Sequence, residues 1–301
     1  MVPHGVQTWQ IGEVIVSRII ESELAGMHPE RLHASLTAAR VRQFAWLTPD
    51  YADEHGTLML SVHAFVVESM GRRIIVDTCV GNDKPRENPH WNMLNHPFLE
   101  NLETAGFAPE TIDTVLCTHL HVDHVGWNTR WNGQAWVPTF PGAKYLFART
   151  EWEHWTTVAR SGDETGRAAR MLQRETVFAD SIAPVVDAGL HLLVETDHQI
   201  TDEVRLVPTP GHTPGHVSVE IRSAGRRAII TGDMLHHPVQ IADPDICSNF
   251  DSDQRLSAQT RHGFVASHAD SDILVLGTHF ATPSAGYIVS ATGGRRLVQR
   301  D

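Results

Sequence analysis

The residues from Cys117 to His124 form a segment of the type that binds metal ions. His119, His121 and His124 supply imidazole nitrogens and Asp123 supplies a carboxylate, in a chain of 301 residues with 20 histidines. Borderline divalent cations such as Zn²⁺ prefer these ligands. His119 and His121 are two positions apart, so an extended backbone would direct both side chains to one side. Asp123 and His124 need a turn to reach a second point nearby. We therefore expect one short loop to serve two adjacent metal ions.

Three later segments place a residue of the same kind in a turn or at the end of an apolar run. His212 lies at the centre of a loop rich in proline and glycine. An apolar strand over 228–233 ends in Asp233, and another over 272–279 ends in His279. Open α/β layers collect their functional residues at the carboxyl ends of strands. The pattern therefore predicts a metal site built at strand ends.

The order of these motifs resembles the signature of the metallo-β-lactamase superfamily, which is HxHxDH followed by His, Asp and His. The resemblance spans nearly the whole chain, and every signature position is filled. It implies two sets of three ligands and one shared carboxylate. The first metal would be held by His119, His121 and His212. The second would be held by Asp123, His124 and His279, and Asp233 would bridge the two.

Such a pair of metal ions supports hydrolysis. Two ions about 3.5–4 Å apart can share a hydroxide and lower its pKa toward neutrality, which gives a nucleophile without serine or cysteine. The ligand types fit zinc best, and iron, manganese and cobalt are alternatives. Asp233 as the bridge and Asp123, which could protonate the leaving alkoxide, are the expected catalytic carboxylates.

The elements that would position these residues alternate between strands and helices. Strands are expected over residues 13–20, 58–67, 73–77, 192–195, 204–208 and 217–221. Helices are expected over residues 98–106, 150–159, 163–178 and 252–266, with Ser252 as an N-cap. The segments 71–77 and 225–233 are similar, because each is a hairpin turn that leads into a buried strand ending in aspartate.

The internal similarity suits the fold that the resemblance implies. This fold is an αββα sandwich of the α/β (α+β) class, in which two mixed β-sheets pack face to face with helices outside. No linker or low-complexity segment divides the chain, so we expect a single domain over residues 1–301. Its N-terminal half would cover about 1–185 and its C-terminal half about 186–301, with the metal site at the seam.

Composition limits the partners. The formal net charge of −12 argues against nucleic acid, because a phosphate backbone requires clustered lysine and arginine. No apolar run reaches transmembrane length, and the N-terminus lacks the basic start and apolar core of a signal peptide. Cys79, Cys117 and Cys247 are an odd, widely spaced set that suggests no disulfide framework. We therefore expect a cytoplasmic protein without a membrane partner.

Two residues are expected to support the metal ligands. Asp77 ends its strand as Asp233 does, but it has no place in the signature, so we expect it to accept a hydrogen bond from a ligand histidine or from the loop backbone. A strand-end carboxylate without this role is the alternative. His216 follows His212 by four residues, and the resemblance selects His212 as the ligand. His216 is then expected to be a structural hydrogen-bonding residue.

Three residues are candidates for contact with substrate. His236 stands where related N-acyl homoserine lactonases carry a tyrosine that polarises the substrate carbonyl, so it could donate to substrate or cap the loop. The Gly-Asp-x-x-His arrangement is more similar to the methyl parathion hydrolase branch. Trp127 begins a region that also holds Trp131, Trp136, Trp152 and Trp155. It could form an apolar substrate wall or pack a long loop. Phe280, next to His279, is the other candidate.

These features favour a dinuclear metal-dependent hydrolase whose bridging hydroxide opens a lactone or cleaves a small neutral ester. The alternative substrate is an organophosphate triester, and the alternative of another class is a non-catalytic metal-binding protein of the same fold. The substrate would be small and neutral or partly apolar. Residues 21–57 and 80–97 are expected to be rich in loops and to cover the metal cleft or a contact within a homodimer.

Overall fold

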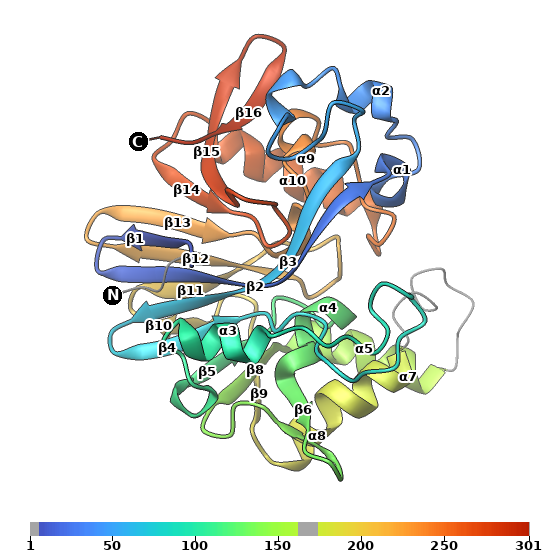
Figure 1. The fold of residues 1–301 in the computed structure, drawn as a ribbon. Coiled ribbons are helices and arrows are strands. Elements are labelled where there is room, and N and C mark those ends of the chain that lie inside the picture. Colours follow the sequence, from blue (N-terminus) through green and yellow to red (C-terminus); the bar gives the residue numbers. More distant parts are fainter. Residues whose placement is uncertain (1–5, 162–173, 301) are drawn as a thin grey trace. The chain divides into compact units, whose positions relative to one another are not determined.

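The computed structural model of this chain describes residues 6–161 and 174–300 (Figure 1). It divides into two compact units. Unit 1 comprises residues 1–21 and 63–196, and unit 2 comprises residues 22–62 and 197–301. The strands form two seven-stranded sheets, each with parallel and antiparallel pairs, and a small two-stranded sheet. The expected α/β class with two mixed sheets and helices is confirmed.

The division between the units differs from the expected halves. It falls within β2 (Val14–Met27), within β3 (Leu58–Ser69) and after Thr196. Residues 22–62 therefore belong with the C-terminal part of the chain. The reason is a shared apolar core, in which Leu32 and Leu47 pack in one cluster with residues such as Phe280.

The sheet of unit 1 carries the loop that holds the first four candidate ligands. Its strand order is β1-β2-β3-β4-β5-β8-β9. β3 pairs antiparallel with β4 and β4 pairs parallel with β5, with Val76 opposite Leu116. The carboxyl ends of β4 and β5 are therefore adjacent. Besides β2 and β3, the strands of this sheet are β1 Thr8–Ile11, β4 Arg72–Val76, β5 Thr114–Leu116, β8 Lys144–Ala148 and β9 His191–Val194.

Helices and a hairpin complete unit 1. The helix α5 packs on β8 and β9, and α8 packs on β7 (Figure 1). The remaining elements are α3 Phe98–Thr104, η2 Pro109–Thr111, α4 Val122–Val125, η3 Gly126–Asn128, β6 Thr129–Trp131, β7 Trp136–Pro138, α5 Arg149–Ser161, α7 Arg174–Val177, the π-helical turn η4 Phe178–Ile182 and α8 Ala183–Asp187.

Unit 2 repeats the same strand pairing. β12 pairs antiparallel with β13 and β13 pairs parallel with β14, with Ile230 opposite Leu276. The similarity between residues 71–77 and 225–233 thus corresponds to a repeated hairpin followed by a parallel strand. The strands run in the order β10 Gln199–Thr201, β11 Val204–Pro208, β12 Val217–Ser223, β13 Arg226–Ile230, β14 Ile273–Leu276, β15 Ala285–Ala291 and β16 Gly294–Val298.

The helices of unit 2 include one long one. α10 contacts α9, which packs on β16 (Figure 1). The helical elements are α1 Pro29–Leu32, α2 Ala38–Val41, η1 Ala45–Leu47, η5 Gly232–Met234, α9 Val239–Ala242 and α10 Gln254–His268. Over residues 6–161 and 174–300, no helix is long and apolar enough to cross a membrane.

Several boundaries differ from those expected. The N-cap of α10 is Asp253 rather than Ser252, because the Asp253 carboxylate accepts a hydrogen bond from the N–H of Leu256 at 2.9 Å. Residues 21–57 are not simply loops, since they contain the end of β2 and two short helices. Of the helix expected over 163–178, the part before 174 lies outside the described residues.

Candidate active site

Four candidate ligands lie in unit 1, directly after β5. His119 and His121 precede the short helix α4, and Asp123 and His124 lie within it. The three imidazoles are buried, and the ring of His119 lies 4.4 Å from that of His121 and 4.1 Å from that of His124. One ligand atom of His119 lies within 4.8 Å of one of His121, and the same holds for Asp123 and His124. The expected turn therefore gathers all four residues in one loop.

Asp77 orients two of these imidazoles. Its Oδ2 lies 3.0 Å from Nδ1 of His124, and its Oδ1 accepts a hydrogen bond from the N–H of Thr118 at 2.8 Å. The Thr118 hydroxyl also donates to Asp77, at 3.0 Å, so it is left to accept from Nδ1–H of His119 at 3.1 Å. Both rings are thus held through Nδ1, which makes Nε2 the nitrogen suited to a metal.

Helix α5 supports the same loop from another direction. The Glu151 carboxylate accepts hydrogen bonds from the N–H of Leu120 at 3.1 Å and from the indole of Trp155 at 2.5 Å. The Trp155 ring in turn meets His121 edge to face at 5.5 Å. Glu151 therefore fixes the backbone between the first two histidines.

Three candidate ligands lie in unit 2. His212 is in the loop between β11 and β12, Asp233 is in η5 after β13, and His279 follows β14. All three are buried. Oδ2 of Asp233 lies 3.4 Å from Nε2 of His212, and Oδ1 of Asp233 lies 3.1 Å from Nε2 of His279. One carboxylate therefore presents a different oxygen to each imidazole.

This donor set fits divalent metal ions. An ion bound to nitrogen and oxygen at about 2.0–2.2 Å separates the two atoms by about 3.0–3.5 Å, depending on the angle between the bonds. The two Asp233–imidazole distances fall in this range. The imidazoles are also fixed through their other nitrogen, since Nδ1 of His212 bonds Asp251 at 2.9 Å and Nδ1 of His279 bonds the carbonyl of Ser61 at 2.9 Å. Metal-binding histidines typically have such partners.

Asp251 is itself held in a charged network. Burial acts to raise the pKa of Asp251, but the hydrogen bond and charge of His212, followed by the charges of His236 and Arg261, outweigh it and lower the pKa to about 2. The guanidinium of Arg261 is fully buried and lies 3.7 Å from Asp251. It also donates to the carbonyl of Met234, the residue after Asp233, at 3.0 Å. Arg261 therefore links the support of His212 to the loop of Asp233.

His216 and His236 flank the Asp233 carboxylate. Nε2 of His216 accepts a hydrogen bond from the N–H of Asp233 at 2.8 Å, and its Nδ1 bonds Thr209. Nε2 of His236 lies 3.2 Å from Oδ2 of Asp233, and its ring lies 4.9 Å from that of His212. Burial lowers the pKa of His236, which favours the neutral imidazole. His216 thus orients the backbone of Asp233, whereas His236 faces its carboxylate.

Trp127 is packed inside unit 1. The side chain is only 5% exposed, its indole stacks on Phe98 at 5.6 Å, and its N–H donates to Glu21 at 2.7 Å. Burial raises the pKa of Glu21 to about 7 in spite of hydrogen bonds from Val80 and Gly81. The role of Trp127 as a substrate wall stays a prediction, and this burial counts against it.

The other aromatic candidates have mixed surroundings. Phe280 has no exposed surface and belongs to the core cluster of unit 2, so its contact with substrate also stays a prediction that its burial disfavours. Trp152 stacks on Phe147 at 6.0 Å, and Trp131, which is 47% exposed, meets Trp136 edge to face at 5.4 Å. In unit 1 the tryptophans therefore serve mostly to pack loops and helix α5.

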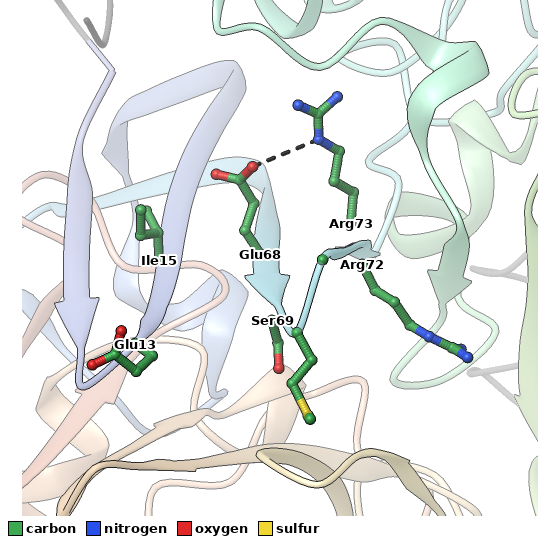
Figure 2. Close-up of a pocket in the computed structure, with 8 residues that line it drawn as sticks. Glu13, Ile15, Glu68, Ser69, Arg72 and Arg73 are labelled. Atoms are coloured by element: carbon green, nitrogen blue, oxygen red, sulfur yellow. Dashed lines mark ion pairs between the residues drawn. The ribbon is translucent and has the colours of Figure 1, made fainter.

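A pocket of about 380 Å³ lies at the opposite end of β4 from Asp77 (Figure 2). Its lining includes Glu13, Ile15 and Glu68, and the Glu68 carboxylate pairs with Arg73 at 3.6 Å. Arg73 also donates to Thr111. None of the candidate metal ligands lines this pocket.

Four supporting residues were missed by the sequence analysis, namely Glu21, Glu151, Asp251 and Arg261. Each is distant along the chain from the residue it supports. Asp251 is 39 residues from His212, and Glu21 is 106 residues from Trp127. The one local signal was Glu151 and Trp155, whose i,i+4 spacing on an expected helix permits the observed hydrogen bond.

Comparison with known proteins gives the family context. The family model described as the metallo-beta-lactamase superfamily matches residues 59–286. The N-acyl homoserine lactonase AiiA of Bacillus thuringiensis subsp. kurstaki is 25% identical over 221 residues, which cover 68% of this chain and 76% of AiiA. An N-acyl homoserine lactonase of Bacillus cereus is 27% identical over 221 residues, which cover 68% of this chain and 76% of that protein.

Two solved structures resemble the chain over nearly its whole length. The hydrolase AbOPH, described as belonging to the beta lactamase superfamily, has a TM-score of 0.82 and 24% identity, covering 100% of this chain and 99% of AbOPH. AidC, described as a dizinc quorum-quenching lactonase, has a TM-score of 0.80 and 17% identity, and the match covers 99% of this chain and 98% of AidC. At these identities the structural likeness concerns the fold.

Proposed function

Since the chain belongs to the metallo-beta-lactamase superfamily and is a metal-dependent hydrolase, we propose that it opens lactones or cleaves small neutral esters. In this proposal seven side chains hold two divalent metal ions, most simply zinc. The seven side chains are His119, His121, Asp123, His124, His212, Asp233 and His279.

The observation that carries the proposal is the environment of Asp233. Its two carboxylate oxygens each face a different imidazole Nε2, at 3.4 and 3.1 Å. A carboxylate bound to a single ion would direct one or both of its oxygens toward the ligands of that one ion. The arrangement therefore supports Asp233 as a bridge between two ions.

When bound, two such ions supply an activated water as nucleophile and a Lewis acid for the substrate carbonyl. The chain supplies the rest. His212 and His279 are fixed through Nδ1 by Asp251 and Ser61, so they need little rearrangement to bind. The carboxylate of Asp123 is 12% exposed, whereas the His124 side chain beside it is fully buried. Asp123 is therefore our candidate for passing a proton to the leaving alkoxide.

His236 is the proposed contact to the substrate carbonyl. Its neutral imidazole can donate one hydrogen bond, and it lies beside Asp233. His236→Ala should lower kcat about tenfold to a hundredfold with metal content unchanged, because one donor to developing charge is lost. His55→Ala is the control, since His55 is 77% exposed in the same unit. Loss of metal instead of kcat would assign His236 to the support of Asp233.

The substrate class follows from charge and from the relatives. A net charge of −12 disfavours anionic substrates, and the curated relatives are named as N-acyl homoserine lactonases. Acyl homoserine lactones are neutral and partly apolar, so we propose them as the first substrates to test, with quorum quenching as the biological consequence. The free thiols of Cys79, Cys117 and Cys247 support a cytoplasmic location. A homodimer stays a prediction.

The test combines metal analysis with a substrate panel. Purified protein should carry about two divalent ions per chain. We expect kcat/KM for acyl homoserine lactones to increase with acyl length, since each buried CH₂ contributes about 0.8 kcal/mol. Aryl esters and one phosphotriester complete the panel. Preference for the phosphotriester would favour the organophosphate alternative, and two bound ions without turnover of any member would favour a non-catalytic protein.

A further inference from the structure

Glu21 is a buried carboxyl group on β2 that the proposed chemistry does not use. It is 5% exposed. Its Oε2 accepts a hydrogen bond from the N–H of Val80 at 3.0 Å, and its Oε1 accepts from the N–H of Gly81 at 2.9 Å and the indole of Trp127 at 2.7 Å. These donors come from two segments, one that follows Asp77, which supports His124, and one that follows the proposed ligand His124 itself.

The two segments are joined directly to each other. The N–H of Thr78 donates to the carbonyl of His124 at 2.8 Å, and the N–H of Trp127 donates to the carbonyl of Thr78 at 2.7 Å. At position 126 the two segments approach so closely that only glycine fits. A Cβ there would lie 1.9 Å from the carbonyl oxygen of Val80. The position of His124 therefore depends on the path of residues 78–81.

That path is not one the chain adopts readily by itself. Asp77 has φ of 59°, Cys79 of 51° and Gly81 of 82°, so three residues of five are in the left-handed region. Residues other than glycine disfavour the left-handed region, so surrounding contacts must maintain this backbone conformation. Glu21 supplies two such contacts, at Val80 and Gly81.

Trp127 extends the same attachment to the end of the metal loop. Its ring face stacks on Phe98 at 5.6 Å with an interplanar angle of 18°, while its N–H is bound by Glu21. The indole is thus fixed both by packing and by a buried hydrogen bond to a carboxyl oxygen. Trp127 follows His124 by three residues, so little chain separates it from the ligand.

We propose that Glu21 is a positioning residue for the metal loop, which fixes Asp123 and His124 by attaching residues 80–81 and Trp127 to β2. The inference rests on the proposed function, because it concerns the affinity of a metal that Asp123 and His124 bind. It also assigns Trp127 to the support of the loop rather than to a substrate wall.

The main test is Glu21→Gln. An amide has one acceptor oxygen and an NH₂ group, so it cannot accept from Val80 and Gly81 as two carboxylate oxygens do. We expect the affinity for the second of two Zn²⁺ ions to fall about tenfold, as when a group that orients a ligand is lost. Competition with a chromogenic chelator measures this. In metal-free protein, the NMR signal of the Trp127 indole N–H should move upfield.

Trp127→Phe removes only the hydrogen bond between the Trp127 indole and Glu21. Phenylalanine keeps a ring to stack on Phe98 but lacks the N–H, so we expect a loss in zinc affinity of about threefold. It also identifies the indole signal. The double variant should lose less affinity than the two single losses combined, because both act through one carboxyl group. Glu103→Gln, exposed on α3, is the matched control and should bind zinc like the wild type.

The outcomes separate this inference from the proposed function. Wild-type protein that binds no zinc would overturn the function. Wild-type protein that binds two ions, with unchanged affinity in Glu21→Gln, would overturn the positioning role even if the melting temperature fell. Trp127→Phe that alters the preference for acyl length but not zinc affinity would also overturn it. If Glu21→Gln does not fold, the zinc affinity of Trp127→Phe decides the test.

Discussion

Asp77 in unit 1 and Asp233 in unit 2 follow corresponding strands of a repeated motif, yet their carboxylates face different atoms. Each strand forms a hairpin with the strand before it and a parallel pair with the next. Asp77 lies against Nδ1 of His124 and the N–H of Thr118. Asp233 lies against Nε2 of His212 and of His279. Asp77 thus contacts the Nδ1 side of one proposed ligand, whereas Asp233 faces the Nε2 atoms of two others.

The distance from the strand end accounts for this difference. Asp77 comes directly after β4, whereas Asp233 comes three residues after β13, within the turn η5. The two extra residues carry the carboxylate beyond the edge of the sheet. His216 then fixes the turn by accepting the N–H of Asp233. A repeated fold element has thus been adapted to two roles by the length of the segment that follows it.

The largest effect is expected for Asp233→Asn. Loss of the shared charge removes one ligand from each of two ions, so kcat/KM should fall on the order of a thousandfold, since metal ions contribute several kcal/mol to the transition state. Bound metal per chain should fall as well, as measured by elemental analysis after dialysis. Asp272→Asn is the control, because that side chain is 98% exposed. Full metal content with near-normal turnover would remove Asp233 from the ligand set.

Asp77→Asn should have a smaller effect of another kind. The amide can no longer accept with both oxygens from Thr118 and His124, so metal affinity should fall about tenfold to a hundredfold. At saturating zinc most of the activity should return, because the ligands themselves remain. Zinc titration of kcat distinguishes the two aspartates. A loss that zinc does not restore would place Asp77 with Asp233 and end the distinction.

Asp251→Asn tests whether a supporting carboxylate in unit 2 behaves like Asp77. Asp251 orients one ligand, His212, and also accepts the N–H of Ser248. Asparagine can still accept from Nδ1–H of His212, so we expect a loss of metal affinity of about tenfold. Chelator competition beside Asp77→Asn gives the ranking. An effect as large as that of Asp233→Asn would mean that His212 does not bind without the negative charge behind it.

Glu220 is a carboxylate on β12 that should affect stability alone. Burial acts to raise its pKa, but hydrogen bonds from Arg222, Arg227 and Arg205 outweigh it and lower the pKa from 4.5 to about 2. The folded state therefore favours the charged form. The stabilisation is complete above pH 4.5 and is lost as pH falls toward 2.

Replacing Glu220 with glutamine should reduce the free energy of unfolding by about 1 kcal/mol or less at pH 7, because the arginines are about half exposed. The difference from wild type should shrink at pH 3, as urea unfolding at both values would show. Metal content and kcat should not change. A loss of metal would instead include Glu220 among the carboxylates that support the site.

The sequence suggested the proposed ligands because their chemistry is local. Three histidines and an aspartate within six residues, and single ligand residues after apolar strands, can be recognised without knowing any distant contact. The supports cannot be recognised in this way. Asp251 reaches His212 only after α10 and its preceding loop have packed, and Glu21 reaches Trp127 across the sheet. Trp127 was a candidate for substrate contact, or for packing a loop, because it lies close in sequence to the ligand candidates, and nothing local pointed to its indole partner 106 residues away.

The same limit applies to the fold. Apolar patterns placed the strands expected over 58–67, 73–77, 192–195, 204–208 and 217–221 within two residues of their observed bounds, since such patterns reflect local burial, but did not predict strands such as β1, β8, β15 and β16. They could not show that β2 continues to Met27, because its last six residues are half-buried or exposed and do not form a buried apolar run. The grouping of residues 22–62 with unit 2 was also missed. It depends on core contacts such as that of Leu32 with residues near Phe280, which no local pattern encodes.

That grouping has a consequence during synthesis on the ribosome. Residues 22–62 emerge early, but their partners in the core of unit 2 emerge last. For example, the backbone carbonyl of Tyr51 is hydrogen-bonded to His237, which lies 186 residues later in the chain. At about 5–20 residues per second, the apolar side chains of this segment wait about 10–40 s for their partners. The nascent chain therefore exposes Leu32, Leu36 and Leu47 for that time, which makes this segment the expected binding site for a chaperone.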